Sequence, residues 1–136
     1  MKVSNHKRDV KLTLADLIAK KADKEEARNK TEEVYVESLG GTIMVHIPER
    51  SVLYKAMDMI GDNSNAEDTM YANAYLIYNS VKEFREADLL SAYEVKDPVE
   101  IVGKLLEIYE IGEVAERILA ISGFSKPEKA RDDIKN

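Results

Sequence analysis

The 136-residue sequence contains no cysteine and only two histidines, His6 and His46. Without cysteine the chain can form neither a disulfide framework nor a metal site built from thiolates. The histidines offer no paired set of imidazole ligands, because His6 falls in a polar N-terminal segment and His46 points outward from a predicted strand. The lack of cysteine also fits a reducing cytoplasm. We therefore expect an intracellular protein without a metal or a disulfide.

The sequence also lacks a long hydrophobic run and an excess of basic residues. No apolar stretch approaches the roughly 18 residues that a membrane-spanning helix needs. The basic residues near the N-terminus are not followed by the hydrophobic region of a secretory signal. The formal charge is −6 at pH 7, which argues against a general nucleic-acid binder because such a protein needs a basic face. We expect a soluble protein that binds neither membranes nor nucleic acids.

No catalytic signature is present: the chain has no G-x-S-x-G, no H-E-x-x-H and no glycine-rich loop that ends in Lys-Ser/Thr. One acidic cluster suggests calcium, and it consists of Asp58, Asp62, Glu67 and Asp68. Counted from Asp62, however, the spacing lacks the glycine at position six and the glutamate at position twelve of a calcium loop. These acids are better explained as helix caps and solvated ends. We predict no catalytic, cofactor or metal residue, and binding is favoured over catalysis.

The clearest positive feature is a predicted β-hairpin over residues 34–47. Two alternating apolar runs flank Gly40-Gly41, and glycine readily adopts the positive φ that a two-residue hairpin turn requires. With that loop Val36 pairs with Val45, and the branched aliphatic residues of both runs share one face. Because a lone hairpin is marginally stable in water, we expect the helices that follow to cover this face.

Residues after the hairpin show the periodicity of several helices. Ser51 is the predicted N-cap of a helix of about ten residues that Gly61 ends. Asn65, with Asp68 three residues later, is a predicted capping box for the next and most apolar helix. That helix carries tyrosines at helical spacing, which form either an aromatic docking strip or, as we favour, core side chains with hydroxyls at the rim: Tyr71, Tyr75 and Tyr78.

The C-terminal half continues this helical pattern. A short helix is predicted at 87–93, and Asp-Pro-Val-Glu at 97–100 is typical of a helix start. Gly112 interrupts the pattern, so a separate helix is expected from Val114, with Gly123 as the residue that ends it. Together these patterns predict an α+β fold, mostly α-helical, with one β-hairpin (about 34–47) packed against a bundle of five or six helices.

The organisation predicted from these patterns has four parts. Residues 1–11 form a mobile basic tail, and residues 12–33 form an N-terminal helix with a charged connector. Residues 34–124 form the globular α+β domain, and residues 125–136 form a charged C-terminal tail.

An apolar stripe lies at the start of the chain, separated from the hairpin by the charged connector. Thr13 and Asp16 loosely match a capping box for its helix, and from 20 to 33 the only apolar side chains are two alanines. Either the helix folds back and covers the core, or it docks on a second chain as an amphipathic helix in a groove. The predicted partner-binding residues are Leu12, Leu14, Leu17 and Ile18.

Three stretches together resemble a known family. LTLADLIAKK at 12–21 runs into the charged linker, VYVESLGGTI follows at 34–43, and DPVEIV comes at 97–102. Over roughly residues 12–124 the chain resembles the XkdN-like tail assembly chaperones of contractile-tailed phages and phage-like elements of Gram-positive bacteria. The family pattern often has Pro-Gly where this chain has Ile111-Gly112.

The resemblance implies a non-enzymatic protein encoded in the tail operon of a prophage. Such a protein binds the tape-measure protein in the host cytoplasm, covers its apolar helical stretches and is absent from the finished tail. The apolar stripe then contacts either this client or a second copy, which would be self-association through the N-terminal helix. The alternative is a structural or accessory component retained in the phage-like tail or baseplate.

Overall fold

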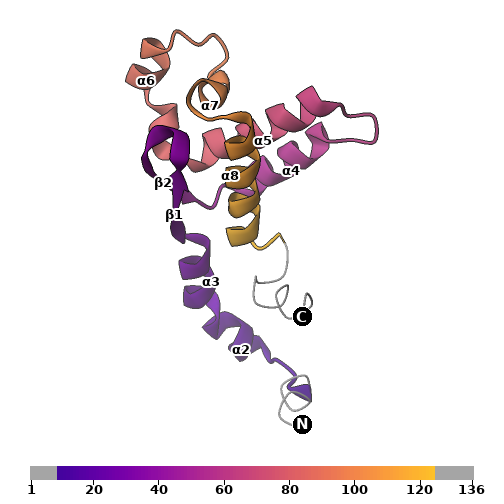
Figure 1. Cartoon of the computed structure of the whole chain (residues 1–136). Coiled ribbons are helices and arrows are strands. Elements are labelled where there is room, and N and C mark those ends of the chain that lie inside the picture. Colours follow the sequence, from indigo (N-terminus) through magenta and orange to yellow (C-terminus); the bar gives the residue numbers. More distant parts are fainter. Residues whose placement is uncertain (1–8, 125–136) are drawn as a thin grey trace, which may run out of the picture.

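The computed structural model describes residues 9–124, and these form a mostly helical α+β fold. Figure 1 shows a helical body with a hairpin at one side and an arm that extends away from the body. The arm consists of α2 (Leu14–Ala19) and α3 (Lys21–Arg28). Residues 1–8 and 125–136, with His6 and most of the predicted tails, lie outside the described residues. The predicted fold class is confirmed.

The hairpin consists of β1 (Thr31–Val36) and β2 (Gly41–His46), which pair antiparallel. The predicted two-residue turn is wrong, because Val36 pairs with Gly41 rather than with Val45. The loop is a 3₁₀ turn, η1 (Glu37–Leu39), followed by Gly40 at a φ of 70°. Glycine is needed there since this left-handed conformation is costly for other residues.

The correct register keeps the predicted faces of the hairpin. Moving the partner of Val36 from Val45 to Gly41 is a shift of four residues, and only an odd shift would exchange the two faces. Val36 and Val45 are fully buried, while Tyr35 and Met44 on the other face are exposed. The alternating pattern therefore predicted which residues are inside, although the pairing itself was wrong.

Helices α4 to α8 follow the hairpin and make the body. Their bounds, with one intervening 3₁₀ helix, are α4 (Arg50–Met59), α5 (Ala66–Ser80), η2 (Lys82–Arg85), α6 (Ala87–Ala92), α7 (Glu100–Leu105) and α8 (Ile108–Ile121).

The helix starts agree only in part with the predicted caps. Asn65 and Asp68 form the predicted capping box of α5. Ser51 is not a cap, because α4 begins at Arg50 and no side chain caps it. Helix α7 begins at Glu100, after a turn in which Asp97 Oδ1 accepts a hydrogen bond from the backbone N–H of Val99 at 3.2 Å. Short polar side chains thus predicted where the chain turns, but they did not reliably predict the residue at which each helix begins.

Helix α8 runs without interruption through Gly112, so the predicted break there is wrong. The chain instead leaves the helical conformation at Leu106, and Glu107 with Glu110 forms a capping box for α8. A glycine inside a helix costs about 1 kcal/mol, which the buried face of α8 outweighs. The predicted helix end is confirmed: Gly123 has a φ of 78°, and the N–H of Phe124 bonds to Leu119 O at 3.1 Å.

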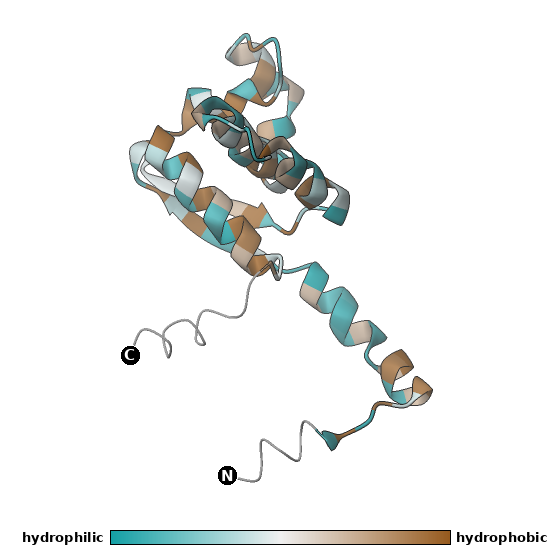
Figure 2. Ribbon diagram, turned by 90° about the vertical axis from the view of Figure 1, so that its right-hand side faces the viewer, coloured by the Kyte–Doolittle hydropathy of each residue, from teal (hydrophilic) through white to brown (hydrophobic). Residues whose placement is uncertain are grey.

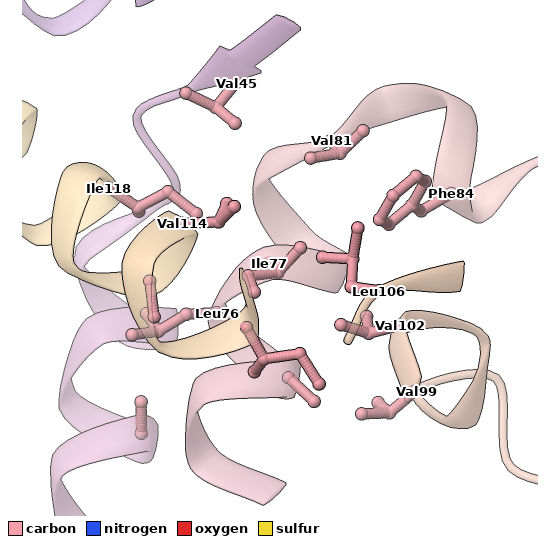
Figure 3. Close-up of a cluster of buried hydrophobic side chains, with 14 of the residues drawn as sticks. Val45, Leu76, Ile77, Val81, Phe84, Val99, Val102, Leu106, Val114 and Ile118 are labelled. Atoms are coloured by element: carbon pink, nitrogen blue, oxygen red, sulfur yellow. The ribbon is translucent and has the colours of Figure 1, made fainter. Parts of the chain in front are cut away.

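The core lies where α5, α7, α8 and the hairpin meet. Figure 3 shows Ile77 of α5 among side chains from α8 and from the end of α7, with Val45 of the hairpin nearby. Ile77, Val45 and Ile118 are 0% exposed. The expectation that the helices after the hairpin cover its aliphatic face is therefore confirmed, with α5 and α8 sharing that role.

Ser80 is expected to be a weak point of this core, and Ser80→Ala should stabilise the protein by about 1 kcal/mol. Its side chain is fully buried, and among residues 9–124 no donor or acceptor reaches its Oγ. An unpaired buried hydroxyl costs roughly 1–3 kcal/mol, and alanine is the better helix former. Urea unfolding measures the difference. Ser122→Ala is the control and should not stabilise, because Ser122 Oγ donates to Ile118 O at 2.6 Å.

Candidate protein-binding surfaces

The arm begins with the capping box that the sequence predicted. Thr13 Oγ1 accepts from the N–H of Asp16 at 3.2 Å, and Asp16 Oδ2 accepts from the N–H of Thr13 at 2.9 Å. These bonds, that from the backbone of Thr13 first, hold the pKa of Asp16 below its ordinary value. The helix α2 is therefore specified locally, without packing against the body, and none of its residues is buried.

The apolar stripe of the arm is exposed to solvent. Leu14 is 75% exposed and Leu17 is 56% exposed. Leu12, Ile18 and also Val10, which the sequence prediction did not include, are exposed as well. Figure 2 shows the charged α3 between this apolar tip and the body. The fold-back alternative is thus wrong for this structure, while docking on a second chain stays a prediction.

The body carries an apolar hollow of 260 Å³ between α4, α5 and the C-terminal end of α8. Its walls include Met57 from α4, Ile60 directly after α4, Leu76 from α5, and Leu119 with Phe124 at the end of α8. Met57 and Ile60 are exposed. We call this surface the apolar hollow. Sequence patterns missed it because it combines α4 and α5 with the end of α8, which is distant in the chain.

An acidic groove of 820 Å³ lies between β1 and α8 and adjoins the apolar hollow. Four carboxylates line it: Glu32, Glu33, Glu113 and Glu116. The one basic residue in its lining, Arg117, is paired with Glu32 at 2.5 Å. The acidic groove and the apolar hollow share Asn73 and Leu119 in their linings.

A third surface, an apolar groove of 560 Å³, lies between α5, α7 and α8. Met70, Gly103 and Ile108 line it, and Ile108 is 75% exposed. At its edge the hydroxyl of Tyr71 donates to Asp97 Oδ2 at 2.9 Å. That bond raises the pKa of Tyr71 above its ordinary value. The groove is therefore a second candidate for binding an apolar segment.

Glu110 ties the hairpin loop to α8 and so fixes the walls of the acidic groove. Its carboxylate is only 3% exposed. It accepts from the N–H of Ser38 at 2.9 Å, from Ser38 Oγ at 2.6 Å and from the N–H of Glu107 at 2.9 Å. One sequence pattern could have identified Glu110, the Glu-x-x-Glu spacing of a capping box at 107–110. No local sequence pattern indicated that its long-range partner is Ser38.

The stability of the protein should depend on the charge of Glu110. Its hydrogen bonds, that from the Ser38 hydroxyl first, lower its pKa. Because this folded-state pKa lies below that of the unfolded chain, the carboxylate stabilises the fold above about pH 4.3, the ordinary glutamate value. The contribution is lost as the pH falls through the folded-state pKa.

We therefore expect Glu110→Gln to be less stable than wild type at neutral pH and to lose less stability on acidification to a pH of about 3.5. Urea unfolding at both pH values measures this. Glu116→Gln replaces an exposed carboxylate on the same helix and should follow the wild-type pH dependence. Parallel curves for wild type and Glu110→Gln would contradict the assignment.

Apolar surfaces and an acidic groove are the features that this fold presents, and they are those of a protein that binds other proteins. Within residues 9–124 no group of three or more His, Asp or Glu is arranged to hold a metal ion. In the same range, every helix is too short or too polar to span a membrane. His46 lies on the hairpin with its Nδ1 3.3 Å from Ile47 O.

The chain belongs to the family of phage XkdN-like tail assembly chaperone proteins, whose family model matches residues 14–135. This confirms the resemblance seen in the sequence. Comparisons with curated proteins and with solved structures give no match. The matched region begins at Leu14, the first residue of α2, so it includes the sequence of the arm.

Proposed function

We propose that this protein binds the tape-measure protein of a phage or prophage tail before the tail is built, in the cytoplasm of the bacterial host. It covers apolar helical stretches of that client and does not catalyse a reaction. Family membership supports a role in tail assembly. The choice of client rests on the resemblance described above and on the surfaces of this chain.

The observation that carries the proposal is the exposed apolar stripe at the end of a charged arm. Leu14, Leu17 and Ile18 lie three to four residues apart on α2, which is the spacing that an amphipathic helix uses to dock against another helix. Exposing such a stripe is unfavourable unless a partner buries it. The charged α3 keeps it in solution and separates it from the body.

Co-expression with the tape-measure protein of the same tail operon tests the proposal. We expect the client to stay soluble and to co-elute with this chain in size-exclusion chromatography. Mass spectrometry of mature particles should then find the client and not the chaperone. A stoichiometric amount of this chain in mature particles would favour the rival function, a component retained in the tail or baseplate. A client that is equally soluble without the chain, and does not bind it, would overturn the proposal.

A further inference from the structure

Charge is distributed unevenly along this chain. Residues 1–21 contain six lysines and arginines and two aspartates, which gives a net charge of +4. Residues 22–136 contain fourteen basic and twenty-four acidic residues, which gives −10. The apolar stripe therefore lies in the basic part of a protein whose remainder is strongly acidic. Such asymmetry favours contact between the first part and an acidic surface of the second.

The arm matches two adjoining surfaces of the body. Its apolar side chains suit the apolar hollow, whose lining contains no charged residue. Lys11 precedes the stripe, and Lys20 and Lys21 follow it, so basic groups flank the apolar ones. The acidic groove adjoins the hollow through shared lining residues. One amphipathic helix can thus fill the hollow and place its lysines beside the carboxylates of the groove.

The arm does not lie in the hollow of its own chain. Its leucines are exposed, and Figures 1 and 2 both show α2 directed away from the body. Near the body, Lys24 and Arg28 of α3 line one pocket together with Arg50 of α4 and Ser122 at the end of α8. Only Asn29 and Lys30 connect α3 to β1. A second copy meets the arm without any change in this geometry.

We propose that, in the absence of a client, the arm of one copy occupies the apolar hollow of a second copy, with its lysines beside the acidic groove. The same stripe then contacts either a second copy or the client. This last consequence rests on the proposed function, whereas the contact between copies does not. Binding of the client would release the stripe from the hollow of the neighbouring copy. Self-association therefore keeps the stripe covered until a client binds.

Disulfide cross-linking tests the contact directly, because the chain has no cysteine of its own. One full-length variant carries Leu17→Cys and the other carries Met57→Cys. Mixed under mild oxidation, they should give a disulfide-linked dimer. The control replaces Met57→Cys with Tyr54→Cys, which is also exposed on α4 but does not line the hollow. We expect the control pair to cross-link at least about tenfold less.

Light scattering of the uncross-linked protein gives a second, independent result. Wild type should have the mass of at least two chains, and Ile60→Asp in the hollow should weaken this association at least about tenfold. Raising the salt concentration from about 0.01 M to about 1 M, which shortens the Debye length from about 30 Å to about 3 Å, should weaken it as well. Glu113→Lys with Glu116→Lys should weaken it in the same direction at low salt.

Three outcomes would overturn the inference. The first is a monomeric mass without cross-links. The second is equal cross-linking by Tyr54→Cys. The third is a disulfide within one chain, which a variant carrying both Leu17→Cys and Met57→Cys would reveal as a monomer with a closed loop. Failure of the proposed function looks different, since a self-associating chain that does not bind the tape-measure protein keeps this contact. Conversely, an Ile60→Asp variant that is monomeric and still binds the client would support both the contact between copies and the proposed function.

Discussion

A chain with Leu14→Asp and Leu17→Asp is expected to lose about 100-fold or more of its affinity for the tape-measure protein while its stability is unchanged. Both leucines are exposed, so their replacement removes no packing and should change the free energy of unfolding by about 0.5 kcal/mol or less. Burial of each leucine against a client contributes about 1.5–3 kcal/mol, and about 1.4 kcal/mol corresponds to tenfold in affinity.

The control for this prediction is Ile108→Asp. Ile108 is 75% exposed, as Leu14 is, but it lies on the body in the groove between α5, α7 and α8. Binding of the purified client and thermal unfolding are measured for both variants. The arm variant should lose binding and Ile108→Asp should keep it. The reverse result would place the client in that groove and refute the role of the arm.

Local patterns predicted the hairpin well except where a loop decides the pairing. Alternation of apolar residues identified the face that contains Val36 and Val45, because burial depends only on the parity of the position. The turn was wrong since Gly40 and Gly41 were taken together as the loop. Of these two glycines only Gly40 has a positive φ, and Gly41 already belongs to β2. The sequence pattern of two adjacent glycines does not indicate which of them adopts the left-handed conformation.

Helix boundaries followed the same division between local and distant causes. The capping boxes at Thr13 and Asn65 were predictable because both partners lie within four residues. The continuity of α8 through Gly112 was not, because it depends on packing against α5, which outweighs the local preference of glycine. Local sequence therefore predicted how helices begin more reliably than whether they continue.

The candidate surfaces divide in a similar way. The stripe on the arm was readable because it is formed by neighbours on one short helix that nothing in the described part of the chain covers. The apolar hollow and the bond between Glu110 and Ser38 join residues far apart in sequence. A periodic pattern reports that a side chain such as Met57 is apolar, but it does not report whether another helix reaches it.

Ile77→Ala is expected to have the largest effect on stability, a loss of about 2–5 kcal/mol. Ile77 is 0% exposed and lies in the last turn of α5. Figure 3 shows it among Val114 of α8, Leu106 after α7 and Val81 beyond the end of α5. Removing three carbon atoms there loses apolar burial and leaves a cavity that these neighbours fill only in part. Against a typical total of about 5–15 kcal/mol, this is a large share.

Urea unfolding followed by circular dichroism and by tyrosine fluorescence measures this loss. Ile77→Val should cost only about 0.5–1.5 kcal/mol, and Ile18→Ala on the exposed arm should change stability by about 0.5 kcal/mol or less. Because Ile77 joins α5 to both α7 and α8, the two probes should shift together. A cost below about 1 kcal/mol for Ile77→Ala, or separate transitions for the two probes, would show that these helices do not share one core.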